Sequence, residues 1–103
     1  MTHYYDQDGN PVMDTLVWAK LFEDENYRQV AYDQIGQVKI STVWLGLDHS
    51  FGSGPRLIFE TMVFGGAHDE EQVRYSTKEQ ALAGHQAMVE RVTREDAGGE
   101  YES

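Results

Sequence analysis

Cysteine is absent from the 103 residues, and basic residues are scarce: 8 Lys and Arg stand against 18 Asp and Glu, for a formal net charge of -10. Without thiols the chain has no disulfide, thiolate zinc site, iron–sulfur cluster or cysteine nucleophile. The absence also fits a reducing compartment. An excess of acid on this scale disfavours direct binding to nucleic-acid phosphates or to anionic lipid.

Long apolar runs are missing as well. No stretch approaches the roughly 18 apolar residues that cross a membrane, and the opening MTHYYDQDGN lacks the basic and apolar regions of a secretion signal. Hydrophobic residues still make up 40% of the chain and aromatics 12%, which suffices for a small core. The length predicts one domain, which we place at residues 1–94, followed by a flexible acidic tail at 95–103.

The acidic residues are concentrated near the N-terminus and in the tail. The first 26 residues carry six acids against Lys20 alone, namely Asp6, Asp8, Asp14, Glu23, Asp24 and Glu25. One interpretation is a solvated surface that aids solubility. The alternative is a decoy surface that resembles nucleic-acid phosphates and docks on a host protein.

Four segments have strand composition. They span Tyr27–Ile35, Val38–Asp48, Leu57–Phe64 and Val73–Tyr75. The middle two are apolar on both faces and rich in β-branched and aromatic residues, which predicts central strands. Centring this pair on its connecting loop places Gly46 opposite Phe59 and Glu60 opposite Leu45.

Two helices are expected around these strands. Asp14 caps the first, over about residues 15–25, and a capping box of Ser76 and Glu79 opens the second, over about 77–93. The predicted fold is α+β: a two-layer domain with an antiparallel sheet of about four strands and two helices packed on one face. The other face keeps large apolar residues, so we expect a homodimer.

The connection between the central strands has the most unusual local chemistry. It joins an acid, an imidazole, hydroxyls, glycines, an aromatic ring and a cation. Together with a carboxylate on a central strand and an imidazole on the last helix, it forms the predicted ligand site: Asp48, His49, Ser50, Phe51, Gly52, Gly54, Arg56, Glu60 and His85. The alternative is a long hairpin loop whose glycines serve only turn geometry.

Catalytic and metal chemistry receive little support. The neighbours Asp48 and His49 point to opposite faces of a strand, and no H-E-x-x-H spacing is present. A G-x-S-x-G elbow is also missing. We therefore predict no metal, no cofactor and no catalytic residue. For His85, two interpretations stay open: a partly buried imidazole satisfied by a carbonyl or carboxylate, and a side chain that contacts ligand.

Two stretches resemble a family of small proteins encoded by tailed bacteriophages and prophages, notably those of actinobacteria. They are Thr42–Phe64, TVWLGLDHSFGSGPRLIFETMVF, and Arg74–Val89, RYSTKEQALAGHQAMV. The resemblance runs through most of residues 4–92 and brings no catalytic residue with it. Members tend to read G-P-P after the glycines, where this chain has Gly54-Pro55-Arg56, so the resemblance does not extend to Arg56.

The resemblance implies expression in the cytoplasm of the bacterial host, where small phage proteins commonly act by binding. We therefore expect a non-enzymatic accessory protein of host takeover or counter-defence, which sequesters a small nucleotide-derived immune signal in a pocket at a dimer interface. The alternatives are an acidic inhibitor that docks on a host protein, and a small hydrolase that uses Asp48, His49 or His85. Neither direct nucleic-acid binding nor membrane binding is expected.

Overall fold

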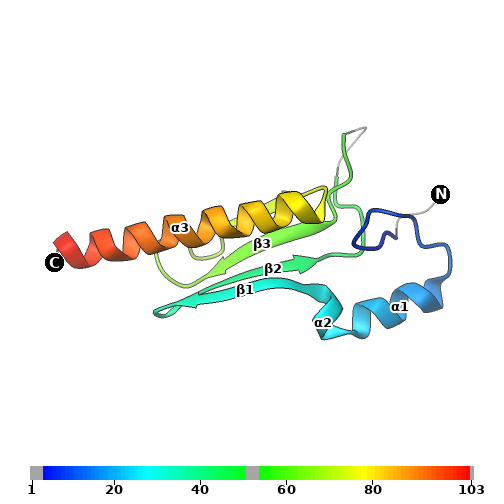
Figure 1. The fold of residues 1–103 in the computed structure, drawn as a ribbon, viewed down its shortest axis with the longest axis horizontal. Coiled ribbons are helices and arrows are strands. Elements are labelled where there is room, and N and C mark those ends of the chain that lie inside the picture. The colour runs from blue at the N-terminus through cyan, green and yellow to red at the C-terminus, as the bar shows by residue number, and fades with distance from the viewer. Residues whose placement is uncertain (1–3, 51–53, 103) are drawn as a thin grey trace.

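The computed structural model describes residues 4–50 and 54–102, with side chains described as far as residue 95. Its elements follow the order α1 (Thr15–Glu23), α2 (Glu25–Arg28), β1 (Gln29–Ile35), β2 (Val38–Trp44), β3 (Phe59–Phe64), β4 (Gln72–Tyr75) and α3 (Lys78–Glu102). The strands of this part of the chain form one antiparallel sheet in the order β1-β2-β3-β4. The predicted α+β class is confirmed (Figure 1).

The long helix α3 covers one face of the sheet along its length (Figure 1). Every second residue of β2 and β3 points toward this helix and is buried: Ile40, Thr42 and Trp44 on β2, and Phe59, Thr61 and Val63 on β3. The helix contributes Ala81, His85, Met88 and Val92 to the same layer. Because strand side chains alternate, this period of two leaves the remaining residues on the other face.

That second face of the sheet carries no helix along its length in the part of the chain the structure describes (Figure 1). Val43 and Met62 are half-buried there, and Phe64 is exposed. We call the outward surface of β1 to β4 the open face. The expected uncovered apolar surface is therefore present.

The short helix α1 packs at the end of the sheet, where its aromatic side chains extend the core under α3. Asp14 caps it by accepting a hydrogen bond from the Leu16 amide at 2.9 Å, as predicted. Trp18 and Phe22, one turn apart, stack with their ring centroids 5.0 Å apart. Phe22 then meets Trp44 of β2 at 6.1 Å. These contacts fix α1 against the sheet.

A second helical turn, α2, replaces the predicted start of the first strand. The Asp24 carboxylate accepts hydrogen bonds from the amides of Asn26 and Tyr27, so the acidic run that follows α1 caps a new helical turn. The strand β1 consequently begins at Gln29, not at Tyr27. Tyr27 instead packs edge-on against Trp44, with centroids 5.0 Å apart.

The pairing of β2 with β3 corrects the predicted register. Trp44 lies opposite Phe59 and Val43 opposite Glu60, two residues from the pairing expected from the loop centre. The Leu45 amide continues this register by bonding the Ile58 carbonyl, but the next bond joins the His49 amide to the Leu57 carbonyl, so the connection is longer on the β2 side. A slip of two residues preserves which side chains share a face, whereas a slip of one exchanges the faces.

The start of α3 differs by one residue from the predicted capping box. The Thr77 hydroxyl accepts a hydrogen bond from the Gln80 amide, and the Gln80 side-chain oxygen accepts from the amides of Ser76 and Thr77. The sequence Ser76-Thr77-Lys78-Glu79-Gln80 contains two overlapping matches to the box pattern, and the second one forms. At its other end α3 continues to Glu102, through most of the segment that we had expected as a tail.

Candidate functional site

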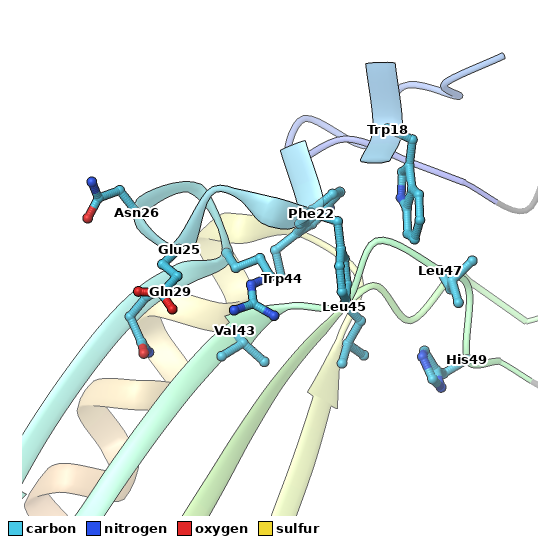
Figure 2. A pocket seen from close by; sticks show the side chains of 11 residues that line it. Trp18, Phe22, Glu25, Asn26, Gln29, Val43, Trp44, Leu45, Leu47 and His49 are labelled. Carbon is cyan, nitrogen blue, oxygen red and sulfur yellow. The ribbon is translucent and has the colours of Figure 1, made fainter. Parts of the chain in front are cut away.

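A groove of about 760 Å³ opens between the α1–α2 segment and the end of β2. Figure 2 shows it with Val43 and Leu45 on the strand side and Trp18 and Phe22 on the helix side. Its lining is aromatic and aliphatic at the centre, with polar groups around it: Trp18, Phe22, Trp44, Val43, Leu45, Leu47, Glu25, Asn26, Arg28, Gln29 and His49. Such a combination is typical of small-molecule sites.

Trp18 holds its position in the groove through Gly46. Its indole Nε1 atom donates a hydrogen bond of 3.1 Å to the Gly46 carbonyl. Gly46 has a φ of +77°, and a Cβ at this position would lie 2.8 Å from the same Nε1 atom. Only glycine fits this position, because the left-handed backbone disfavours a side chain and the nearby indole ring leaves no room for one. The end of β2 thus fixes the aromatic wall.

Arg28 brings the positive charge of the groove. It is the last residue of α2, and its guanidinium carbon lies 5.1 Å from the centroid of the Phe22 ring. Its Nε atom is buried and has no hydrogen-bond partner among the described residues. Glu25 also lines the groove but is exposed, so solvent screens its carboxylate. A stacked guanidinium that lines a groove suits an anionic group such as a carboxylate or a phosphate.

Within the predicted loop, Asp48 has a structural role. Its Oδ1 atom accepts hydrogen bonds from the Ser50 amide at 2.8 Å and from the Leu57 amide at 3.1 Å, which ties the two ends of the loop together. Burial raises the pKa of this carboxyl, but the hydrogen bonds from Ser50 and Leu57 and the charge of Arg56 outweigh it, so the pKa is lowered. His49 follows directly, and its side chain lines the groove.

Two other predicted loop residues, Gly54 and Arg56, lie away from the groove. Phe51 and Gly52 fall outside the described residues. Gly54 and Arg56 line a separate hollow of about 500 Å³. There Arg56 donates to the Gly9 carbonyl at 3.1 Å, and its guanidinium carbon lies 4.5 Å from the Tyr5 ring centroid. The structure therefore does not bring Arg56 and His49 to one pocket.

The last two predicted site residues lie on opposite faces of the sheet. Glu60 is on the open face, where its carboxylate accepts from the Arg74 Nε atom at 3.0 Å. His85, on α3, is buried between that helix and the sheet, where its ring is hydrogen-bonded to Thr42 and Asp33. A hydroxyl, an imidazole and a carboxylate in a row resemble a hydrolytic triad. Thr42 is completely buried, however, so no substrate reaches its hydroxyl.

Apart from His49, the residues that line the groove were absent from the predicted site. Trp18 and Phe22 fall within the predicted first helix, and Arg28 within the predicted strand Tyr27–Ile35. The available signal was an aromatic pair one helical turn apart, followed by a lone arginine after an acidic run. Sequence alone does not show that α2 turns Arg28 back onto Phe22.

Among the residues whose side chains are described, 4–50 and 54–95, no group of three or more His, Asp or Glu side chains is placed to hold a metal ion. None of the helices described is long and apolar enough to cross a membrane. Comparisons with protein-family models, curated proteins and solved structures found no match. The groove is therefore the feature of the molecule from which a function is proposed.

Proposed function

We propose that this chain is a binding protein that holds a small anion of the nucleotide class in the groove. The observation that carries the proposal is Arg28: its guanidinium stacks on Phe22 beside a groove with tryptophan walls, and its Nε atom has no partner within the described structure. Because the Arg28 side chain lines the groove, an anionic ligand seated there would meet a guanidinium that stacking on Phe22 already holds in place.

The chemistry of the lining fits the parts of a nucleotide. Aromatic side chains stack on a base, a contact worth about 1–3 kcal/mol. Arg28 offers N–H groups to a phosphate, while Val43, Leu45 and Leu47 supply an apolar floor. The volume of about 760 Å³ lies within the usual range for ligands of this size.

The resemblance to phage accessory proteins supplies the setting of the proposal. In the cytoplasm of an infected bacterium, the ligand would be a small nucleotide-derived immune signal, and binding would remove it from the host response. The net charge of -10 disfavours long nucleic acids, which contact a surface through many phosphates. A single nucleotide needs only the local charge of Arg28.

Calorimetric titration with AMP, cyclic di-AMP and adenosine tests this proposal. We expect saturable binding of at least one phosphorylated compound and weaker binding of adenosine, which lacks the phosphate. Arg28→Gln should reduce nucleotide affinity by about tenfold or more, the range for a lost charged hydrogen bond. Absence of binding by both nucleotides would overturn the proposal.

Arg56→Gln is the matched control for this substitution. Arg56 also places its guanidinium over an aromatic ring, that of Tyr5, but it lines the other hollow. Its removal should leave nucleotide affinity unchanged. If Arg28→Gln and Arg56→Gln weaken binding equally, the nucleotide is held by general charge and not by the groove.

A second candidate function is docking on a host protein through the acidic N-terminal region. Met13 and Leu16 are 80% and 74% exposed there, next to Asp14 and the acidic run at 23–25. An apolar surface framed by acids suits a partner with apolar and basic residues. A complex that weakens with salt and is lost in Leu16→Glu would support this function. A complex that survives reversal of Glu23, Asp24 and Glu25 would remove it.

A further inference from the structure

We propose that the open face of the sheet is a homodimer interface, and that a second copy seated on it closes the exposed side of the groove. The open face carries apolar side chains that an isolated chain leaves in water. Phe64 at one end is 45% exposed and Tyr32 on β1 is 49% exposed. Between them lie Ser41 of β2, opposite Tyr32, and Met62 of β3, opposite Ser41.

The charge of the open face argues for a second copy as its occupant. Its charged side chains on the strands are Lys39, Glu60 and Arg74, and Glu60 and Arg74 pair with each other at 3.0 Å. Two basic side chains and one acidic side chain give this face a net charge of +1, whereas the whole chain has a net charge of -10. Two copies can therefore meet here without the repulsion that their other surfaces impose.

Two other exposed apolar surfaces are less suited to contact between two copies of the chain. Met13, Leu16 and Val17 lie beside Asp14 and the acidic run 23–25, so two copies meeting there would oppose like charges. Leu82 on α3 is 44% exposed, but it is an isolated apolar residue among exposed polar neighbours. The open face combines two exposed residues, Tyr32 and Phe64, and two half-buried ones, Val43 and Met62, with a near-neutral charge.

The open face and the groove share part of their surface. Val43 is an outward residue of β2 that also lines the groove, and Leu45 follows it in the same lining (Figure 2). A second copy on the open face consequently lies next to the mouth of the groove. This coupling of dimerisation to ligand binding rests on the proposed function, whereas the dimer itself does not.

Light scattering coupled to size-exclusion chromatography, repeated over a range of protein concentrations, measures the dimer. The wild type should show twice the mass of one chain. Phe64→Glu should shift the protein to the monomer, because it places a carboxylate in the interface. Leu82→Glu is the matched control, with nearly the same exposure on the opposite side of the molecule, and should stay dimeric. A wild-type monomer at every concentration would overturn the proposal.

A second variant separates loss of association from loss of folding. Tyr32→Glu acts on β1, two strands away from Phe64, and should also give a monomer. Circular dichroism of each variant should match that of the wild type. If both variants stay folded and dimeric, the interface lies elsewhere and the proposal is wrong.

Titration of AMP into the same samples distinguishes the two proposals. If the protein is a dimer but binds no nucleotide, the proposed interface stands and the proposed ligand class is wrong. If the protein is a monomer that binds AMP, the proposed groove stands and the proposed interface is wrong. Where both stand, Phe64→Glu should also lower AMP affinity by about fivefold or more, as expected for coupled equilibria. Unchanged affinity in the folded monomer would show that the second copy does not complete the groove.

Discussion

The Nδ1 atom of His85 lies 2.7 Å from the Oγ1 atom of Thr42, and both side chains are buried between α3 and the sheet. The Nε2 atom of the same ring lies 2.8 Å from an Asp33 carboxylate oxygen. With the proton on Nε2, the ring donates to Asp33 and accepts from Thr42, which in turn accepts from Thr61. This polar chain joins α3 to three strands and explains why a histidine sits in the core.

Removing the imidazole should destabilise the fold. His85→Ala leaves a cavity and deprives Thr42 of a partner, so we expect a loss of about 2–4 kcal/mol in the free energy of unfolding. Urea denaturation measures it. Gln86→Ala, at the exposed neighbouring position of α3, should change stability by less than about 0.5 kcal/mol. Equal effects of the two substitutions would contradict this role for His85.

Alanine at Gly46 should disturb the aromatic wall of the groove. The new Cβ would lie 2.8 Å from the Trp18 Nε1 atom, on a backbone with φ of +77°. We expect a loss of about 1–3 kcal/mol in stability and an altered tryptophan emission spectrum. Gly54→Ala is the control, because its Cβ meets nothing within 4 Å. An unchanged spectrum in Gly46→Ala would show that Trp18 does not depend on this glycine.

Asp48 should make stability depend on pH in the acid range. Its pKa lies below the ordinary value of 3.8 in the folded chain, because the bonds from Ser50 and Leu57 and the Arg56 charge outweigh burial. A lowered pKa stabilises the folded chain above the ordinary value, and this contribution disappears as the pH falls through the folded value. Asp48→Asn should therefore be less stable than the wild type at about pH 7, with the gap closing as the pH falls through the lowered pKa of Asp48. Thermal melting measures the gap, and a gap that widens toward acid would contradict the assignment.

Added salt should strengthen the proposed dimer. Each chain carries a net charge of -10, so two copies repel one another at long range although the open face is close to neutral. Raising the salt from about 0.01 M to 0.15 M shortens the screening length from about 30 to 8 Å and removes most of that repulsion. The dimer dissociation constant should fall accordingly. A constant that rises with salt would point to an interface held by ion pairs.

The elements with strong periodicity or caps were predictable from the sequence. Apolar residues on both faces, many of them β-branched or aromatic, predicted β2 and β3 as central strands, and Asp14 predicted the start of α1. What could not be predicted depends on contacts between distant residues. The strand register follows from hydrogen bonds beyond Trp44, and the choice of Thr77 over Ser76 depends on how α3 meets the sheet.

The same limit applies to the candidate site. His49 was predicted and lines the groove, while the partners of Trp18 and Arg28 come from segments far along the chain or from the unforeseen turn α2. Glu60 and His85 were grouped with the loop because strand and helix patterns do not show which face each side chain occupies. The sequence pattern therefore indicated the chemistry of single residues better than it indicated which of them lie together in the fold.

The most direct test of nucleotide binding in the groove is a calorimetric comparison of AMP and cyclic di-AMP with adenosine, on the wild type and on Arg28→Gln. We expect the wild type to prefer at least one of the two nucleotides over adenosine by about tenfold or more, and this preference to disappear when the guanidinium is removed. A wild type that binds neither nucleotide, or a preference for a nucleotide that survives in Arg28→Gln, would contradict the proposed function.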